Sequence, residues 1–468
     1  MISFFKYQDP LRFSMILIIL IIIRLPALIY GYPLLIPELT WQLIGEKMSD
    51  GFVLYRDIWT ATEPFSAGVY YFLDILFGKS QFMLQFFSLL LVFIQAAIFN
   101  FVLSINNLYP ERTYVPALLY VIFSSLFFEF YTLSPPMLGM TFIIMAMHFV
   151  FFQIRTSEDD ENIFYTGNLI AIASLFYFPF IICIVLVVLA FLFFTGATLR
   201  KYFLLLTGFI FPFIVVGTYY FVREGLDSFL SSFGMALFSD TELMVSGKAL
   251  GVGLIVPVLL LIVSIFAIYS KARYINYQYI AIRIFLFWLI LSFITLYFTR
   301  MLSTFHLFIF VPSLSFFSAH FFLLVRRKLI REIVFAASVI IILWINYAVL
   351  YQFATNKKPL PYEEMLVKEG PEFSAYKDKM LLVLGNDRSC YKNNHLATPY
   401  LNWELSQKHF SDLNNYETVS EVYENFVNDM PEVIIDQDTV AEQLFKRLPK
   451  LGQQYKKVEG KNIYHKLP

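Results

Sequence analysis

The sequence predicts an α-helical polytopic membrane protein with a small α/β domain at its C-terminal end. Two observations predict this fold class. Hydrophobic residues make up 58% of the 468 residues and charged residues only 15%, and the mean hydropathy is +0.65. A soluble domain has about one quarter charged residues, so this composition is typical of an integral membrane protein. In addition, apolar runs of spanning length recur as far as residue 352, whereas the region 358–468 is polar.

The apolar runs predict about eleven transmembrane helices in a domain over residues 1–352. The first run contains Arg24-Leu25-Pro26 and lacks a small-residue cleavage site, so we expect it to be a retained span. The run 165–197 is too long for one straight helix, and Pro179 disfavours helix at the residue before it. We therefore expect two short helices there. The other nine spans, including the first run, lie at about 13–30, 82–104, 114–130, 137–154, 202–222, 251–270, 282–299, 303–325 and 333–352.

Basic residues predict the orientation of these spans. With eleven spans and a cytoplasmic N-terminus, the clusters Arg200-Lys201, Lys271 with Arg273, and Arg326-Arg327-Lys328 all fall on the cytoplasmic side. This distribution satisfies the positive-inside rule. The loops 31–80 and 223–250 and the C-terminal domain then lie on the extracytoplasmic side.

Composition also excludes several classes of function. The net charge is zero and the pI is about 7, which argues against nucleic acid as a partner. Two cysteines, Cys183 in an apolar run and Cys390 in the polar region, cannot form a disulfide framework or a structural zinc site.

The region 358–468 reads as a soluble α/β domain. Residues 380–385 and 431–436 are short apolar runs that predict buried strands, and the patterns at 420–427 and 440–447 predict helices between and after them. Alternation of strands and helices is typical of a compact α/β unit. The segment Gly385-Asn386-Asp387 lacks the glycine spacing of a phosphate-binding loop.

The loop 31–80 is unusually long for a connection between spans, and long structured loops are usually functional. Pro37-Glu38 predicts the start of a helix that runs from Glu38 to about Asp50 and is closed by Gly51. A second amphipathic helix is predicted from Phe65 to Phe77, closed by Gly78.

Three acids of this loop, Glu38, Asp57 and Glu63, are expected around one cleft. A carboxylate can act as a general base toward a hydroxyl, and several carboxylates can bind a divalent cation that neutralises a phosphate leaving group. Two structural alternatives stand beside this hypothesis. Glu38, at the first or second position of its helix, can simply complement the helix dipole, and Asp57 can form a salt bridge with Arg56.

This layout resembles the GT-C superfamily, polytopic glycosyltransferases that use polyprenyl-phosphate sugars on the extracytoplasmic side. The resemblance rests on the acid after the first span, the amphipathic helix, the pattern G-x-x-x-Y-x-D ending at Asp57, and a proline near the second helix. More narrowly, the chain resembles a group of inner-membrane proteins of Bacteroidota. That likeness lies in Pro37-Glu38-Leu39, Leu54-Tyr55-Arg56-Asp57, Ser134-Pro135-Pro136 and Thr398-Pro399-Tyr400-Leu401-Asn402-Trp403.

The resemblance implies roles for individual residues. Glu38 falls on the position of the catalytic base, although Pro37 stands where the family often has a second acid. Any Mg²⁺ or Mn²⁺ site then depends on Asp57 or on the loop 223–250. The chain also departs from the family at Thr62-Glu63-Pro64, where the commoner enzymes have two prolines.

Basic and histidine side chains at the outer end of a late span contact the lipid phosphate in this family, and Arg300 and His306 match that position. The alternatives are that Arg300 snorkels to the interface and that His306 bonds a neighbouring carbonyl. Acceptor or loop contacts are predicted at Glu63, Tyr55, Glu224 and Asp240.

The preferred hypothesis is an inner-membrane glycosyltransferase that moves a sugar from a polyprenyl-phosphate donor to a glycan, lipid or protein acceptor. The rival is a catalytically inactive GT-C-like scaffold, a subunit of an envelope-assembly or secretion complex. A transporter is less favoured because charges within the spans are few and no paired halves with broken helices occur.

Overall fold

The computed structural model describes the chain except for residues 157–159, 239–241, 244–246, 272–273, 298, 300, 355–364, 369–375, 398 and 468. The chain divides into two compact units. We call residues 1–32, 81–216 and 236–364 the membrane unit, and residues 33–80, 217–235 and 365–468 the loop unit.

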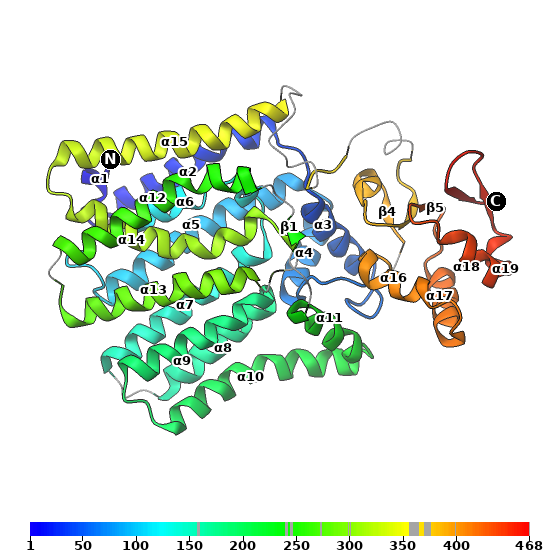
Figure 1. Ribbon diagram of the computed structural model, residues 1–468, viewed down its shortest axis with the longest axis horizontal. Coiled ribbons are helices and arrows are strands. Elements are labelled where there is room, and N and C mark those ends of the chain that lie inside the picture. Colours follow the sequence, from blue (N-terminus) through cyan, green and yellow to red (C-terminus); the bar gives the residue numbers. More distant parts are fainter. Residues whose placement is uncertain are drawn as a thin grey trace. The chain divides into compact units, whose positions relative to one another are not determined.

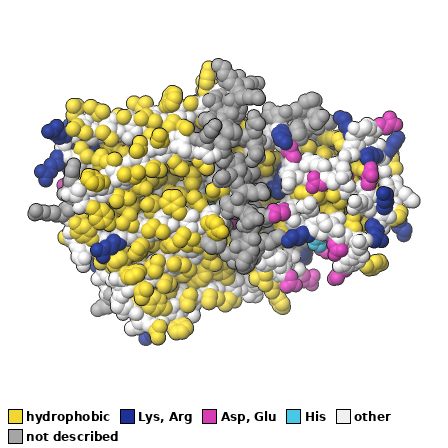
Figure 2. Space-filling model, in the orientation of Figure 1, with side chains coloured by type: hydrophobic (Ala, Val, Ile, Leu, Met, Phe, Trp, Pro, Cys, Tyr) yellow, Lys and Arg dark blue, Asp and Glu magenta, His cyan; other side chains and the backbone are white. Residues whose placement is uncertain are grey.

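The membrane unit is helical and apolar, which confirms the prediction of a polytopic membrane protein (Figure 1). Hydrophobic side chains cover the visible face of its helices (Figure 2). Within the described residues, eight helical segments are long and apolar enough to cross a membrane. They lie in α2 (Pro10–Tyr30), α5 (Gln81–Ile105), α7 (Pro135–Thr156), α10 (Leu199–Val222), α12 (Gly247–Lys271), α13 (Asn276–Tyr297), η3 with α14 (Thr304–Phe310 and Val311–Leu324) and α15 (Lys328–Ala354).

Three further predicted spans are shorter helices: α6 (Val115–Phe123), α8 (Asp160–Phe176) and α9 (Cys183–Phe194). The 3₁₀ turn η2 (Phe178–Ile182) separates α8 from α9 and contains Pro179, so the predicted break in the run 165–197 is confirmed. The unit also holds the short helix α1 (Ile2–Phe5) and the two-residue strands β1 (Glu242–Leu243) and β2 (Met301–Leu302).

A buried arginine donates hydrogen bonds to backbone carbonyls in the non-helical segment between α6 and α7. Arg24 of α2 is 1% exposed, and it donates from Nη1 to Ser88 Oγ at 2.8 Å. Its Nη2 donates to the carbonyl oxygens of Ser124 and Phe130, each at 3.1 Å. Backbone groups at membrane depth need partners within the protein. Arg24 therefore satisfies carbonyls that the end of α6 and the turn η1 (Phe128–Tyr131) leave outside a helix.

In the loop unit, helices α3 (Ile36–Ser49) and α4 (Pro64–Phe77) pack closely. A Cβ atom on Gly45 of α3 would lie 2.5 Å from the carbonyl oxygen of Tyr70 in α4, so only glycine fits there. The ring of Trp41 stacks on that of Tyr70 at 5.4 Å. As the sequence predicts, each helix is followed by a glycine with positive φ. Helix α4 ends directly before Gly78, and α3 ends at Ser49, with one residue between its end and Gly51.

The C-terminal part of the loop unit contains a five-stranded sheet in the order β4-β3-β5-β7-β6. Strand β3 is parallel to β4 and β5, and β7 is antiparallel to β5 and β6. The predicted strands and helices are present, and the small C-terminal α/β domain is confirmed. The elements are β3 (Met380–Leu384), η4 (Ser389–Asn393), β4 (His395–Leu396), α16 (Trp403–Ser411), α17 (Tyr416–Asn428), β5 (Val433–Asp436), α18 (Ala441–Arg447), α19 (Pro449–Gly452), β6 (Tyr455–Lys457) and β7 (Ile463–Lys466).

The loop after α2 is built into this domain. Ile36 N–H donates to the carbonyl of Met365 at 2.8 Å, and Val367 N–H donates to that of Leu34 at 3.0 Å. Further along, Trp59 exchanges backbone hydrogen bonds with Pro399 and Asn402 and packs against the core of the domain. Segments more than 300 residues apart in the sequence thus share one hydrophobic core.

Candidate functional site

Glu38 is fully buried in the first turn of α3, with 0% of the residue exposed. The helix begins at Ile36, two residues earlier than expected, so Glu38 occupies the third helical position and not the first or second. Pro37 fits the second position because no backbone donor is needed there. The Glu38 carboxylate accepts the backbone N–H of Leu35 at 3.2 Å, which is the acid's half of a capping box. Glu38 therefore has a local structural role at the start of the helix, and its role as a base stays a prediction.

Glu38 shares its surroundings with Tyr70 and Glu63. Burial raises the pKa of the Tyr70 phenol well above its usual value, and the nearby carboxylates of Glu63 and Glu38 raise it further. The pKa of Tyr55 is raised as well, mainly by burial and to a smaller extent by Tyr220 and Glu63. We call Glu38, Glu63, Tyr55 and Tyr70 the acid–tyrosine cluster. Two of the three predicted acids, Glu38 and Glu63, thus both lie near Tyr70.

Asp57, the third predicted acid, is held by its neighbours. Arg56 bonds both of its oxygens, with Nε to Oδ1 at 2.8 Å and Nη2 to Oδ2 at 2.9 Å. The Val53 N–H also donates to Oδ2 at 2.8 Å. The salt-bridge alternative is thus realised. In the described part of the chain, no group of three or more His, Cys, Asp or Glu side chains is arranged to hold a metal ion.

The predicted loop contacts differ in accessibility. Tyr55 is 1% exposed and has a φ of 68°, a strained value for a residue with a side chain. Its hydroxyl donates to the carbonyl of Thr62 at 2.8 Å, and its ring packs on Tyr220 and Phe229. Glu224 is exposed and therefore open to a ligand. Asp240 lies outside the described residues.

Of the two predicted phosphate contacts, Arg300 also lies outside the described residues. His306 is the third residue of η3 in the membrane unit and is 8% exposed. Its Nδ1 accepts the Ser303 N–H at 3.2 Å and lies 3.1 Å from the Ser303 hydroxyl. Nδ1 also lies 3.3 Å from the Ser303 carbonyl oxygen, to which it would donate in its other tautomer, and that bond to a neighbouring carbonyl is the alternative stated for His306.

Sequence reasoning missed Glu129, an acid of the membrane unit that is 0% exposed in η1. A signal was available, because an acid inside an apolar run is costly and is a functional candidate by default. Glu129 falls inside the predicted span 114–130.

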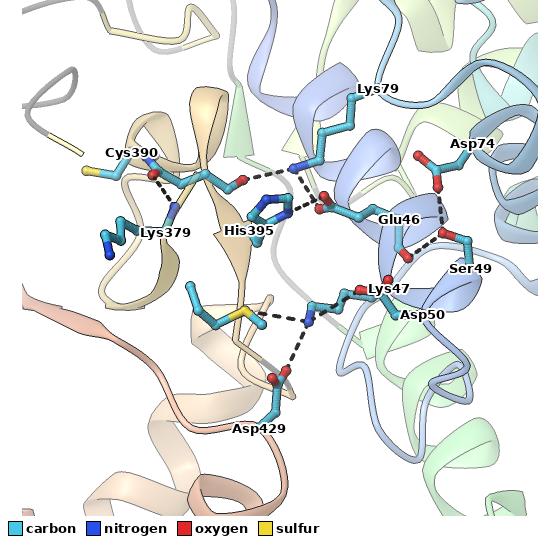
Figure 3. Close-up of polar contacts among 12 residues, drawn as sticks. Glu46, Lys47, Ser49, Asp50, Asp74, Lys79, Lys379, Cys390, His395 and Asp429 are labelled. Atoms are coloured by element: carbon cyan, nitrogen blue, oxygen red, sulfur yellow. Dashed lines mark hydrogen bonds and ion pairs between the residues drawn. The ribbon is translucent and has the colours of Figure 1, made fainter. Parts of the chain in front are cut away.

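Sequence reasoning also missed a buried ion pair between α3 and the C-terminal domain (Figure 3). Lys47 Nζ lies 3.0 Å from Asp429 Oδ2, and the two side chains are 1% and 9% exposed. Lys47 also lies 3.7 Å from Asp50 and over the ring of Phe52 at 4.9 Å. Lysine is almost never fully buried unless it is paired. The partner of Lys47 is 382 residues away in sequence, so no local pattern predicts the pair.

A second polar link lies on the neighbouring residue of α3. Glu46 Oε2 forms an ion pair with Lys79 Nζ at 2.6 Å, and its Oε1 accepts a hydrogen bond from His395 Nδ1 at 2.6 Å (Figure 3). Lys79 also donates to the carbonyl of Asn394 at 2.8 Å. Together with Lys47, these contacts fix the C-terminal half of α3 against strands β3 and β4.

Similarity to solved structures identifies the fold. No family profile and no curated protein matches the sequence. Among solved structures, ArnT from Cupriavidus metallidurans bound to undecaprenyl phosphate matches with a TM-score of 0.55 at 10% identity, over 97% of both chains. The chain has the GT-C fold. Apo ArnT matches with a TM-score of 0.53 at 11% identity over 96% of both chains.

The GT-C fold covers the whole chain and not only its spans, because the match to ArnT takes in 97% of the residues. An Archaeoglobus fulgidus oligosaccharyltransferase matches 94% of this chain and 71% of its own, with a TM-score of 0.48 at 12% identity. The predicted GT-C architecture is confirmed at the level of fold by the two ArnT structures, whose TM-scores are 0.55 and 0.53.

Proposed function

We propose that this protein is a membrane glycosyltransferase that moves a sugar from a polyprenyl-phosphate donor to an extracytoplasmic acceptor. The observation that carries the proposal is the match to ArnT, a protein solved with undecaprenyl phosphate, along nearly the full length of both chains. The position of Glu38 supports it, because α3 is the first helix after α2 and the GT-C resemblance places the base there. The distribution of basic residues supports an inner-membrane location with a cytoplasmic N-terminus.

In this proposal Glu38 is the general base. Its carboxylate takes the proton of an acceptor hydroxyl, whose oxygen attacks the anomeric carbon of the donor sugar. The bond between that carbon and the phosphate oxygen breaks, and the phosphate leaves with the electron pair. Attack opposite the leaving group inverts the anomeric centre. Arg300 and His306 stay the predicted contacts of the departing phosphate.

A divalent cation would stabilise the phosphate as a Lewis acid. The described residues do not fit one, because both oxygens of Asp57 are bonded by Arg56 and no third acid or histidine completes a ligand set. We therefore assign no step to Mg²⁺ or Mn²⁺ at Asp57.

Two variants of Glu38 separate the base from the cap. Glutamine can accept the Leu35 N–H in place of glutamate, since both residues serve in capping boxes, but it cannot take a proton from the acceptor. We expect Glu38→Gln to keep the folded helix and to lose transfer of a labelled sugar from a polyprenyl-phosphate donor. Glu38→Asp, which keeps a carboxylate on a shorter side chain, should retain part of the activity.

The rival function is a scaffold that has the GT-C fold without catalysis. It is favoured by one observation, since both acids make local structural contacts: Glu38 accepts the Leu35 N–H, and Asp57 forms the predicted salt bridge with Arg56. The scaffold predicts that the wild-type protein transfers no sugar from any polyprenyl-phosphate donor, and that Glu38→Gln changes neither its folding nor its partners.

A further inference from the structure

The sheet of the C-terminal domain has a point at which ligands commonly bind. Its three parallel strands are ordered β4-β3-β5. From β3 the chain continues to β4 on one side, and it later returns to form β5 on the other side of β3. In open α/β sheets, ligands bind beyond the carboxyl ends of the strands at such a switch point. Here that position is made by the segments that follow β3 and β5. Gln437 joins them through two hydrogen bonds to the backbone of Asp387, at 3.1 and 3.2 Å.

Arg388 extends from this position to α3, the helix that bears Glu38. Its Nη1 donates to the hydroxyl of Thr40 at 3.0 Å. Its Nε is buried and, among the described residues, has no hydrogen-bond partner. The Thr40 contact uses one corner of the guanidinium group. The edge formed by Nε and Nη2 is the geometry that binds a carboxylate or a phosphate through two parallel hydrogen bonds.

The charge of Arg388 is not balanced by the acid beside it in sequence. Asp387 is paired with Lys368 Nζ at 2.7 Å, and its other oxygen accepts the Ser389 N–H at 3.0 Å. Burial acts to raise the pKa of Asp387, but these partners hold it below its ordinary value, so the acid is ionised and already paired. Burial lowers the pKa of the Arg388 guanidinium, while Tyr391 acts to raise it, and no ion pair of Arg388 occurs among the described residues.

Arg388 is partly exposed, but its Nε is buried and, among the described residues, makes no hydrogen bond. Removing a charged donor from water without a partner is unfavourable, and an anionic ligand would offset that cost. Thr40 and Glu38 are two residues apart on α3, about 3 Å along the helix axis and about 200° around it. A group bound at Arg388 would lie close to the proposed base along α3, but on the face turned toward the C-terminal domain.

We propose that Arg388 and Thr40 bind an anionic group, a phosphate or a carboxylate, of the acceptor substrate. This deepens the proposed function and rests on it, since it assigns the C-terminal domain the selection of a negatively charged acceptor. The acceptor and not the donor is chosen because Arg388 stands on a soluble α/β domain, whereas the predicted donor contacts belong to the span region. A phosphate group of the lipid donor is the competing source of the same chemistry.

The test uses the full-length protein in detergent, with inorganic phosphate as the acceptor-side probe and undecaprenyl phosphate as the donor-side probe. Arg388→Gln removes the charge, and Arg388→Lys keeps a charge without the bidentate edge. Arg447→Gln is the matched control, because Arg447 is a surface arginine of α18 in the same domain and bonds Asn414. Phosphate binding is followed by thermal shift against chloride at equal ionic strength, and lipid binding by native mass spectrometry.

We expect phosphate to stabilise the wild type and Arg447→Gln, to bind Arg388→Gln about tenfold more weakly or worse, and to bind Arg388→Lys at an intermediate level. Undecaprenyl phosphate should bind all four proteins equally. Loss of the lipid from Arg388→Gln would overturn the assignment to the acceptor and place Arg388 at the donor. Equal phosphate binding by all variants, or none by the wild type, would overturn the site itself. If the wild type fails to bind undecaprenyl phosphate, the proposed function fails while the phosphate result still decides the site.

Discussion

Replacing Lys47 by methionine should loosen the hold of the C-terminal domain on α3. Lys47 and Asp429 are 1% and 9% exposed and 3.0 Å apart, so methionine would leave the Asp429 carboxylate buried without its cation. Breaking a buried pair from one side costs about 3–5 kcal/mol. The reciprocal change, Asp429→Asn, should cost less. Lys47 would keep its contact with Asp50 at 3.7 Å and its position over the Phe52 ring.

Hydrogen exchange measures this effect locally, which matters because a two-unit membrane protein does not unfold in one step. We expect the amides of α3 and β3 to exchange at least about 100-fold faster in Lys47→Met, since about 1.4 kcal/mol corresponds to each factor of ten. The double variant Lys47→Met with Asp429→Leu should recover most of the loss, because an apolar pair of similar size is often as stable as a buried ion pair.

A matched control is the ion pair of Lys457 with Glu442, whose side chains are 42% and 57% exposed in the same domain. Lys457→Met should leave the exchange of α3 and β3 unchanged. The reasoning would be refuted if Lys47→Met and Lys457→Met had equal effects, or if the double variant were no better than Lys47→Met alone.

Three other predictions concern packing and polar contacts. Gly45→Ala should destabilise the loop unit by about 1–3 kcal/mol, because the added Cβ meets the Tyr70 carbonyl at 2.5 Å. Gly68→Ala in α4, where an added Cβ would meet no atom of another element within 4 Å, should be neutral or slightly stabilising when both variants are compared by thermal melting in detergent. Glu38→Ala should lower stability by about 1 kcal/mol through loss of the cap, and Glu38→Gln should not, as judged by exchange of the first turn of α3. Arg24→Lys should lower the melting temperature in detergent, because a single ammonium cannot reach Ser88 and the carbonyls of Ser124 and Phe130 together; an unchanged melting temperature would contradict this role.

The fold was largely predictable because its signals are local. Apolar runs mark the spans, Pro179 marks the break before α9, and Gly51 and Gly78 mark the ends of α3 and α4. Proline and glycine act on the backbone of their own neighbourhood, so one sequence is sufficient to interpret them.

The candidate site was less predictable because its contacts join distant segments. Lys47 finds its partner at Asp429, and Arg388 meets Thr40 across 348 residues. Neither pairing leaves a periodic pattern in the sequence. Glu38 illustrates the same limit, since its helical position depends on the hydrogen bond from Ile36 to Met365, which pairs the start of α3 with the C-terminal region.

The central claim is that this GT-C fold transfers sugar from a polyprenyl phosphate with Glu38 as the base. The most direct measurement incubates membranes containing the wild type or Glu38→Gln with radiolabelled polyprenyl-phosphate sugars and follows label into extracytoplasmic acceptors. The account predicts transfer by the wild type and a loss of about 10²–10⁴-fold in Glu38→Gln at equal protein level. Transfer at the wild-type rate by Glu38→Gln would contradict the assignment of the base, and absence of transfer from every donor by the wild type would favour the scaffold.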